Sequence, residues 1–177
     1  MFRFLLFINI LLTNVFAHPH TFIEVYPSIV ATDNKTTSIG FKWKMDEMTS
    51  TMLIMEFDSN GNGKIDKKEN QYIYDNYFLE LVDYNFYTNI KINGKIQRFS
   101  QPIDFKATIE NMKVCYSFKL KENYNTKRLA IEFGDEDFFV AMILKKEFVK
   151  TKGIYAKVLE LDNEFFFGYR LEFEGGK

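Results

Sequence analysis

The sequence contains few residues that cross-link chains or bind transition metals: of its 177 residues, 2 are histidine and 1 is cysteine. The single cysteine, Cys115, cannot form a disulfide within the chain, and the strand pattern around it places it on the more polar face. We expect it to pack as a small residue beneath a neighbouring element, with a reactive or metal-binding thiol as the alternative.

Recognisable catalytic machinery is also scarce. Both histidines, His18 and His20, lie near the N-terminus, so none remains to act as the base for a serine or cysteine nucleophile. No glycine-rich phosphate-binding loop is present. Two acidic clusters, Asp46-Glu47 and Asp135-Glu136-Asp137, are interpreted as solvated surface. A non-enzymatic role is therefore favoured, and an enzyme would need a metal at the N-terminus to do its chemistry.

The chain has no excess of charge of one sign, since 23 basic and 24 acidic residues give a formal net charge of −1. This balance argues against a nucleic-acid partner. The one pronounced apolar run, residues 4–12, follows a positively charged start and precedes Val15-Phe16-Ala17. It is too short to span a bilayer. We expect residues 1–17 to be a signal peptide cleaved near Ala17, with an uncleaved anchor as the alternative. The mature chain, residues 18–177, is then one periplasmic or secreted domain without a transmembrane segment.

The most informative stretch is Asp58-Ser-Asn-Gly-Asn-Gly-Lys-Ile-Asp-Lys-Lys-Glu69, which fits the twelve-residue calcium loop of an EF-hand. Gly63 falls where the loop turns sharply, and Ile65 falls where a side chain packs inward. Lys64 would bind through its backbone carbonyl. The predicted calcium ligands are Asp58, Asn60, Asn62, Lys64, Asp66 and Glu69. Because Lys64, Lys67 and Lys68 lie among only three carboxylates, we expect a weak site that suits a calcium-rich compartment.

A second candidate metal site lies at the new N-terminus, His18-Pro19-His20. A terminal histidine offers its α-amine and imidazole to one ion, and a second histidine adds a nitrogen, which together form a histidine brace suited to copper, nickel or zinc. Pro19 has no amide proton, so the full square-planar amino-terminal copper or nickel motif cannot form. The alternative is a frayed terminus with two solvated imidazoles.

The fold class predicted by the hydrophobic pattern is α+β. Helical periodicity flanks the calcium loop, which gives an EF-hand at about residues 45–82, with Asp46 as the helix cap. The rest of the chain alternates with period two, and Asn93-Gly94 is a strong hairpin signal. We predict an antiparallel β-sandwich or open barrel with the helix–loop–helix inserted. Strands are expected at residues 22–30, 36–43, 86–92, 95–99, 105–110, 113–120, 127–133, 138–144, 154–161 and 164–173.

Methionines recur along the first predicted helix. Met45, Met48, Met52 and Met55 are spaced by three, four and three residues and so share one helical face. We interpret this face as part of the core. The alternatives are that the thioethers bind Cu(I) or that the face contacts a peptide.

Several segments together match the pattern of one known protein family. They are His18-Pro-His-Thr-Phe22, Trp43 to Ser50, the loop Asp58 to Glu69, Phe86-Tyr-Thr88 and Asp135 to Ala141, and they cover roughly residues 17–142. Together they resemble the DUF1007 family. The late segment has Phe for the family's Tyr and lacks its proline. The resemblance implies a periplasmic component of an ABC-type transport system associated with nickel, cobalt or zinc. It also draws Asp46 and Glu47 into a hypothetical metal site near His18 and His20.

These observations favour an exported calcium-binding protein that serves a membrane transporter of a transition metal (Ni, Co, Zn or Cu) as an accessory or binding component. One alternative is a copper-dependent redox enzyme that uses the N-terminal histidines. The other is a structural EF-hand module that binds a partner and leaves the histidines idle.

Overall fold

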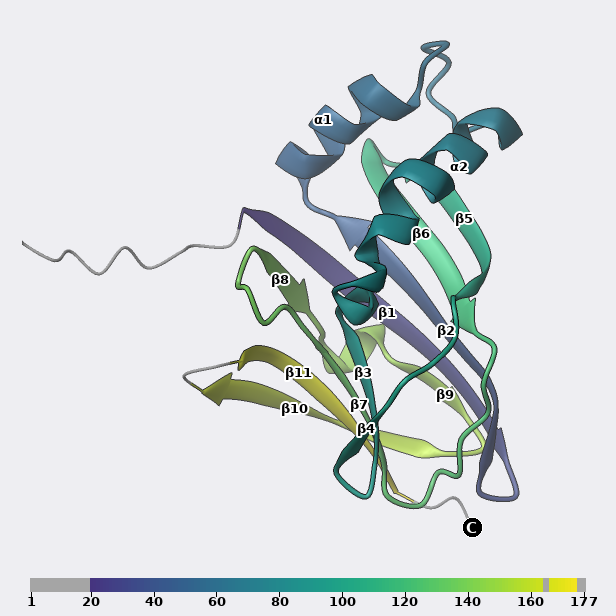
Figure 1. Ribbon diagram of the computed structural model, residues 1–177, viewed down its shortest axis with the longest axis vertical. Helices are drawn as coiled ribbons and strands as arrows, with labels where there is room; N and C mark the ends of the chain where they lie inside the picture. The colour runs from purple at the N-terminus through teal and green to yellow at the C-terminus, as the bar shows by residue number, and fades with distance from the viewer. Residues whose placement is uncertain (1–19, 164–165, 175–177) are drawn as a thin grey trace, which may run out of the picture.

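The structure is a computed structural model that describes residues 20–163 and 166–174, and it contains two β-sheets facing each other with a helical segment at one end (Figure 1). The sheets form a rough sandwich and do not close into a barrel. The first sheet has the order β5-β6-β2-β1-β8, with β9 also paired to β1, and the second has the order β10-β11-β7-β3-β4. The predicted signal peptide and His18 lie outside the described residues.

The strands follow the predicted alternation closely. The first sheet contains β1 (Thr21–Thr32), β2 (Lys35–Met45), β5 (Ile103–Glu110), β6 (Lys113–Leu120), β8 (Val140–Ile143) and β9 (Lys150–Lys152). The second contains β3 (Thr88–Ile92), β4 (Lys95–Gln97), β7 (Leu129–Gly134), β10 (Tyr155–Asn163) and β11 (Phe166–Glu174). The Asn93-Gly94 turn between β3 and β4 is confirmed, and both residues have the positive φ that this tight turn requires, 53° and 75°.

The first sheet is mixed, which corrects the expectation of antiparallel pairing throughout. β1 pairs with β2 in antiparallel fashion but with β8 and β9 in parallel fashion, as in the partners Thr21 with Val140 and Ser28 with Lys150. Neighbours along the chain pair through short turns, whereas β8 and β9 return to β1 from more than a hundred residues away. Such long-range pairing leaves no local signal in the sequence.

The helical segment comprises α1 (Glu47–Phe57), α2 (Lys67–Ile73) and a continuation through a π-helical turn, η1 (Tyr74–Phe78), and two 3₁₀ turns, η2 (Leu79–Val82) and η3 (Asn85–Tyr87). A further 3₁₀ turn, η4 (Lys146–Phe148), precedes β9. Phe78 is fully buried and packs on Phe105 and Phe118, with ring centroids 4.3 and 5.0 Å away. The segment thus covers the end of the first sheet that lies above the second sheet in Figure 1.

The core joins the two sheets and the helical segment into one unit. Phe41 of β2 meets Phe133 of β7 edge-on at 5.4 Å, which links the sheets. Trp43, two residues further along β2, is fully buried and lies 6.4 Å from Phe78 of the helical segment. Two alternate residues on the same face of β2 therefore contact the second sheet and the helical segment, respectively.

The methionine face is not core, contrary to prediction. Met45 is buried, with 5% of its surface exposed, but Met48, Met52 and Met55 are 63%, 54% and 75% exposed. α1 begins only at Glu47, so Met45 belongs to the end of β2. The helix packs instead through a second apolar face that contains Leu53, Ile54 and Phe57.

Candidate functional site

The loop Asp58–Glu69 connects α1 to α2 and is held by hydrogen bonds from its backbone amides to its own side-chain oxygens. The Asp58 carboxylate accepts hydrogen bonds from the amides of Asn62 (3.0 Å) and Gly63 (2.7 Å). The Asn62 side-chain oxygen accepts from the Lys64 amide at 2.8 Å. Gly63 has a φ of +74°, a left-handed conformation that glycine adopts without strain. These contacts tie the side-chain oxygens of the first and fifth loop positions to backbone amides within the loop.

Glu69 closes the loop from the other side. It is only 5% exposed, and its Oε1 accepts hydrogen bonds from Ser59 Oγ at 2.9 Å and Asn60 Nδ2 at 3.0 Å. Its Oε2 accepts from the Asp66 amide at 2.9 Å, while Asp66 Oδ1 accepts from the Glu69 amide. This reciprocal pair is a capping box, and it starts α2. Local helix chemistry therefore places the last predicted calcium ligand against the start of the loop.

The loop is oxygen-rich but carries little net charge. Its three carboxylates, on Asp58, Asp66 and Glu69, are balanced by three lysines within the same twelve residues. Within the part of the chain that the structure describes, no three His, Cys, Asp or Glu side chains gather as a metal-ion cluster. Half of the predicted calcium ligands are asparagine or backbone oxygens, which suit a hard ion such as calcium. The donor set fits calcium better than a transition metal.

The second candidate site lies where β1 begins. His20 is exposed; its amide donates to the carbonyl of Phe139 at 3.0 Å, and the two rings stack with centroids 6.5 Å apart. The exposed imidazole is accessible to a metal ion. His18 lies outside the described residues, so its position relative to His20 stays a prediction.

Asp46 lies beside this strand end and is held by hydrogen bonds. Its Oδ2 accepts from the Phe22 amide (2.9 Å) and the Thr49 hydroxyl (2.7 Å), and its Oδ1 accepts from the Thr49 amide (2.9 Å). Burial works to raise the pKa of Asp46, but these hydrogen bonds outweigh it and lower the pKa. Asp46 is thus the N-cap of α1, as predicted, and Glu47 is exposed in the first helical turn. Metal binding by either residue stays a prediction.

Four of the segments that resemble one family meet, through their described residues, at the same end of the sandwich. Trp43 and Tyr87 have ring centroids 6.1 Å apart, and the Phe139 segment contacts His20. Burial and then the nearby Asp135 carboxylate raise the pKa of Tyr87 to about 12. In Figure 1 the starts of β1, β8 and α1 are grouped at this end. Sequence reasoning had named these segments separately, without predicting that they meet.

Two features of this end were missed by the sequence analysis. Asp135, interpreted as solvated surface, is only 3% exposed, and its carboxylate accepts hydrogen bonds from the amides of Asp137, Phe139 and Val140. It shapes the turn before β8, while Glu136 and Asp137 are exposed as expected. In addition, the consecutive residues Asn85, Phe86 and Tyr87 all have positive φ, 49°, 50° and 47°. Such strain requires support from the surrounding packing, and it breaks the strand predicted from residue 86.

Cys115 fits the prediction of a packed small residue. It has no exposed surface, although it lies on the polar face of β6. Burial raises the pKa of its thiol, which keeps the thiol protonated and unreactive at neutral pH.

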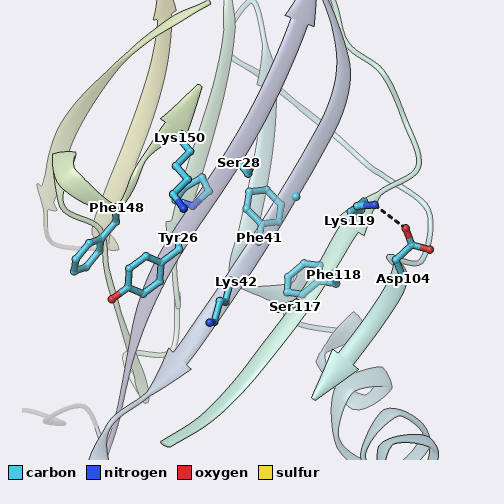
Figure 2. Close-up of a pocket in the computed structure, with 12 residues that line it drawn as sticks. Tyr26, Ser28, Phe41, Lys42, Asp104, Ser117, Phe118, Lys119, Phe148 and Lys150 are labelled. Atoms are coloured by element: carbon cyan, nitrogen blue, oxygen red, sulfur yellow. Dashed lines mark hydrogen bonds and ion pairs between the residues drawn. The ribbon is translucent and has the colours of Figure 1, made fainter. Parts of the chain in front are cut away.

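A separate hollow of about 410 Å³ lies on the first sheet (Figure 2). Tyr26 and Phe148 stack at its rim with centroids 4.3 Å apart. On the other side Lys119 forms an ion pair with Asp104 at 2.9 Å, drawn as a dashed line. Lys42, also in the lining, is paired with Glu110 at 2.6 Å. Lys42 and Lys119 are thus each paired with a carboxylate, while Lys150 also lines the hollow.

The fold and site describe a two-sheet protein with a helical insertion that carries an oxygen-rich loop. The chain matches the family described as "Protein of unknown function (DUF1007)" over residues 3–158, and it belongs to that family. The match extends beyond the segments recognised in the sequence, into β10. Among the described residues, none of the helices has the length and apolar character needed to cross a membrane.

Two relatives are themselves described as uncharacterized. A protein of Spirochaeta aurantia, "Uncharacterized 15.5 kDa protein in trpE 3'region", is 33% identical over 98 residues, which is 53% of this chain and 69% of the relative. An "Uncharacterized protein" of Haemophilus influenzae is 23% identical over 134 residues, which is 72% of this chain and 63% of the relative. These similarities support family membership and carry no activity to this chain.

Proposed function

We propose that this protein is an exported calcium-binding protein whose loop Asp58–Glu69 acts as the calcium site of a single EF-hand. The observation that carries the proposal is the position of Glu69, which is buried and directed at Ser59 and Asn60 near the start of the loop. A glutamate at this position supplies two oxygens to calcium in an EF-hand. The capping box with Asp66 fixes the position of that carboxylate, which supports the proposal.

The proposed role of calcium is structural. α1 is attached to the sheet by buried Ser50, whose hydroxyl accepts a hydrogen bond from the Val114 amide at 3.0 Å. α2 is attached by Asn70, whose side-chain oxygen accepts from the Ala107 amide at 2.6 Å. An ion between the two helices would fix their relative position. Because the loop has no net charge, we expect weak binding that is effective only where calcium is abundant.

Isothermal titration calorimetry tests this proposal. The mature protein should bind one calcium ion. Glu69→Gln should weaken this binding by at least about tenfold, which corresponds to about 1.4 kcal/mol. Asp75→Asn is the matched control, because Asp75 is an exposed acid in η1 outside the loop. Equal calcium affinity in the native protein and Glu69→Gln would show that the loop is not the site.

The second part of the proposal is that the protein serves a membrane transporter of nickel, cobalt, zinc or copper as an accessory. It rests on the transport association that the resemblance in the sequence implies and on the exposed His20, which we propose binds a transition metal together with His18 and its α-amine. The test is metal uptake by native mass spectrometry of the mature protein and of His18→Ala and His20→Ala. Unchanged uptake of nickel, zinc and copper in both variants would contradict this part and leave calcium binding untouched.

A further inference from the structure

The apolar residues of α1 are divided by type between the two faces of the helix. The three exposed ones, Met48, Met52 and Met55, are all methionines. The three that are buried or half-buried, Leu53, Ile54 and Phe57, contain no methionine. An apolar surface as such has no need of sulfur, because leucine or isoleucine would serve equally. The feature that the exposed residues share is therefore the thioether.

Helix geometry brings these thioethers together. At 3.6 residues per turn, the three side chains fall within an arc of roughly 60°, on the side of α1 opposite Ser50 and Phe57. Met48 and Met52 are four residues apart and Met52 and Met55 are three apart, which places each pair of Cβ atoms about 5–6 Å apart. Methionine side chains have three rotatable bonds, so their sulfurs can converge on a shared ion. Met52 is the common neighbour of the other two.

The charge carried by α1 itself favours a cation. α1 contains Glu47 and Glu56, both exposed, and no lysine or arginine. The cationic side chains nearest to it in sequence are Lys44 and Lys64. The face thus combines neutral soft donors with nearby negative charge.

We propose that Met48, Met52 and Met55 form a binding site for one Cu(I) ion, with Met52 as the central ligand. Thioethers are soft ligands that select Cu(I), whereas calcium and magnesium prefer the oxygens that fill the neighbouring loop. The two sites on this helical segment therefore select different metals. The inference deepens the transition-metal part of the proposed function and does not depend on calcium binding.

Competition for Cu(I) against a chromophoric Cu(I) chelator tests the site in the full mature protein. Leucine replaces methionine with little change in volume or hydrophobicity, so Met→Leu removes only the sulfur. We expect the methionine site to bind one Cu(I), with about tenfold weaker binding in Met52→Leu and loss of this site in the triple variant Met48→Leu, Met52→Leu, Met55→Leu. Retention of native Cu(I) affinity by the triple variant would overturn the proposal.

Met112 provides the matched control. It is 72% exposed, and it lies in the turn between β5 and β6, next to the strand that contacts α1 through Val114 and Ser50. That contact is on the side of α1 opposite the three methionines. Met112→Leu should therefore bind Cu(I) as the native protein does, and equal loss in Met112→Leu and Met52→Leu would contradict the assignment to α1.

The pH dependence separates the thioethers from the histidines. Thioethers carry no proton to release, so Cu(I) affinity should be unchanged between about pH 6 and pH 8, whereas histidine ligands would lose affinity as the pH falls. If the Cu(I) affinity of the native protein falls with decreasing pH and this pH dependence is absent in His20→Ala, the ion is bound by the histidines and the proposal is overturned. The triple leucine variant should retain calcium binding, and Glu69→Gln should retain Cu(I) binding. Each proposed site can therefore be disproved without affecting the other.

Discussion

Phe22 and Asp46 hold each other through two reciprocal hydrogen bonds. The Phe22 amide donates to Asp46 Oδ2 at 2.9 Å, and the Asp46 amide donates to the Phe22 carbonyl at 2.9 Å. Asp46 also caps α1, so one side chain joins the start of β1 to the helix that leads into the loop. Hydrogen bonds therefore join the strand that follows His20 to the helix that precedes the proposed calcium loop.

Replacing Asp46 should destabilise the protein. Asp46→Ala removes the helix cap and one of the two bonds to Phe22, and we expect a loss of about 1–2 kcal/mol in the free energy of unfolding by urea. Glu47→Ala, at the next and exposed position, should change stability by less than about 0.5 kcal/mol. Equal effects of the two substitutions would contradict the capping role.

The contribution of Asp46 should depend on pH in a defined direction. Its pKa is lowered in the folded protein, because the hydrogen bonds from Phe22 and Thr49 outweigh the effect of burial. The extra stability is thus present above the ordinary carboxyl pKa of about 4 and is lost as the pH falls through the lowered pKa. The difference in unfolding free energy between the native protein and Asp46→Asn should be constant from about pH 5 to 8 and shrink below about pH 4. A difference that grows toward low pH would contradict the sign.

Phe78 should be the main anchor of the helical segment. It is fully buried against Phe105, Phe118 and Trp43, so Phe78→Ala should cost about 3–5 kcal/mol in urea unfolding. Val82→Ala, in the same segment but 59% exposed, should cost less than about 0.5 kcal/mol. A small effect at Phe78 would mean that the segment is not part of the core.

A buried ion pair in the second sheet should contribute more to the stability of the fold than the exposed ion pairs do. Glu132 is 4% exposed and lies 2.6 Å from Arg170 and 2.8 Å from Lys91. Arg170→Met leaves the buried carboxylate with Lys91 alone, and we expect a loss of about 2 kcal/mol. Lys119→Met, which breaks the exposed pair with Asp104, should cost about 0–1 kcal/mol by the same chemical unfolding measurement. A larger loss of stability in Lys119→Met than in Arg170→Met would contradict the claim that burial determines how much these ion pairs contribute.

The parts of the fold that local chemistry determines were predictable from the sequence. The cap at Asp46 and the turn at Asn93-Gly94 depend on residues next to one another, and the structure has both. The capping box of Asp66 and Glu69 follows from the same kind of signal, although the sequence analysis had assigned these residues only to calcium.

The predictions that were wrong concern contacts between residues far apart in the sequence. Periodicity identified a methionine face on α1, but the opposite face, with Leu53 and Phe57, is equally apolar, and only the sheet decides which one is buried. Similarly, the parallel pairing of β8 with β1 and the left-handed turn at Phe86 are set by distant contacts. The meeting of His20 with the Phe139 segment could not be read from the sequence for the same reason.

The central claim is that calcium binds the loop and stabilises the fold, and the melting temperature tests it most directly. An ion that binds only the folded state stabilises it by an amount that grows with the logarithm of its concentration once that concentration exceeds the dissociation constant. The melting temperature of the protein should rise with millimolar calcium and fall after chelation, while that of Glu69→Gln should respond little to either. A native protein whose melting temperature is the same with calcium and with chelator would contradict the account.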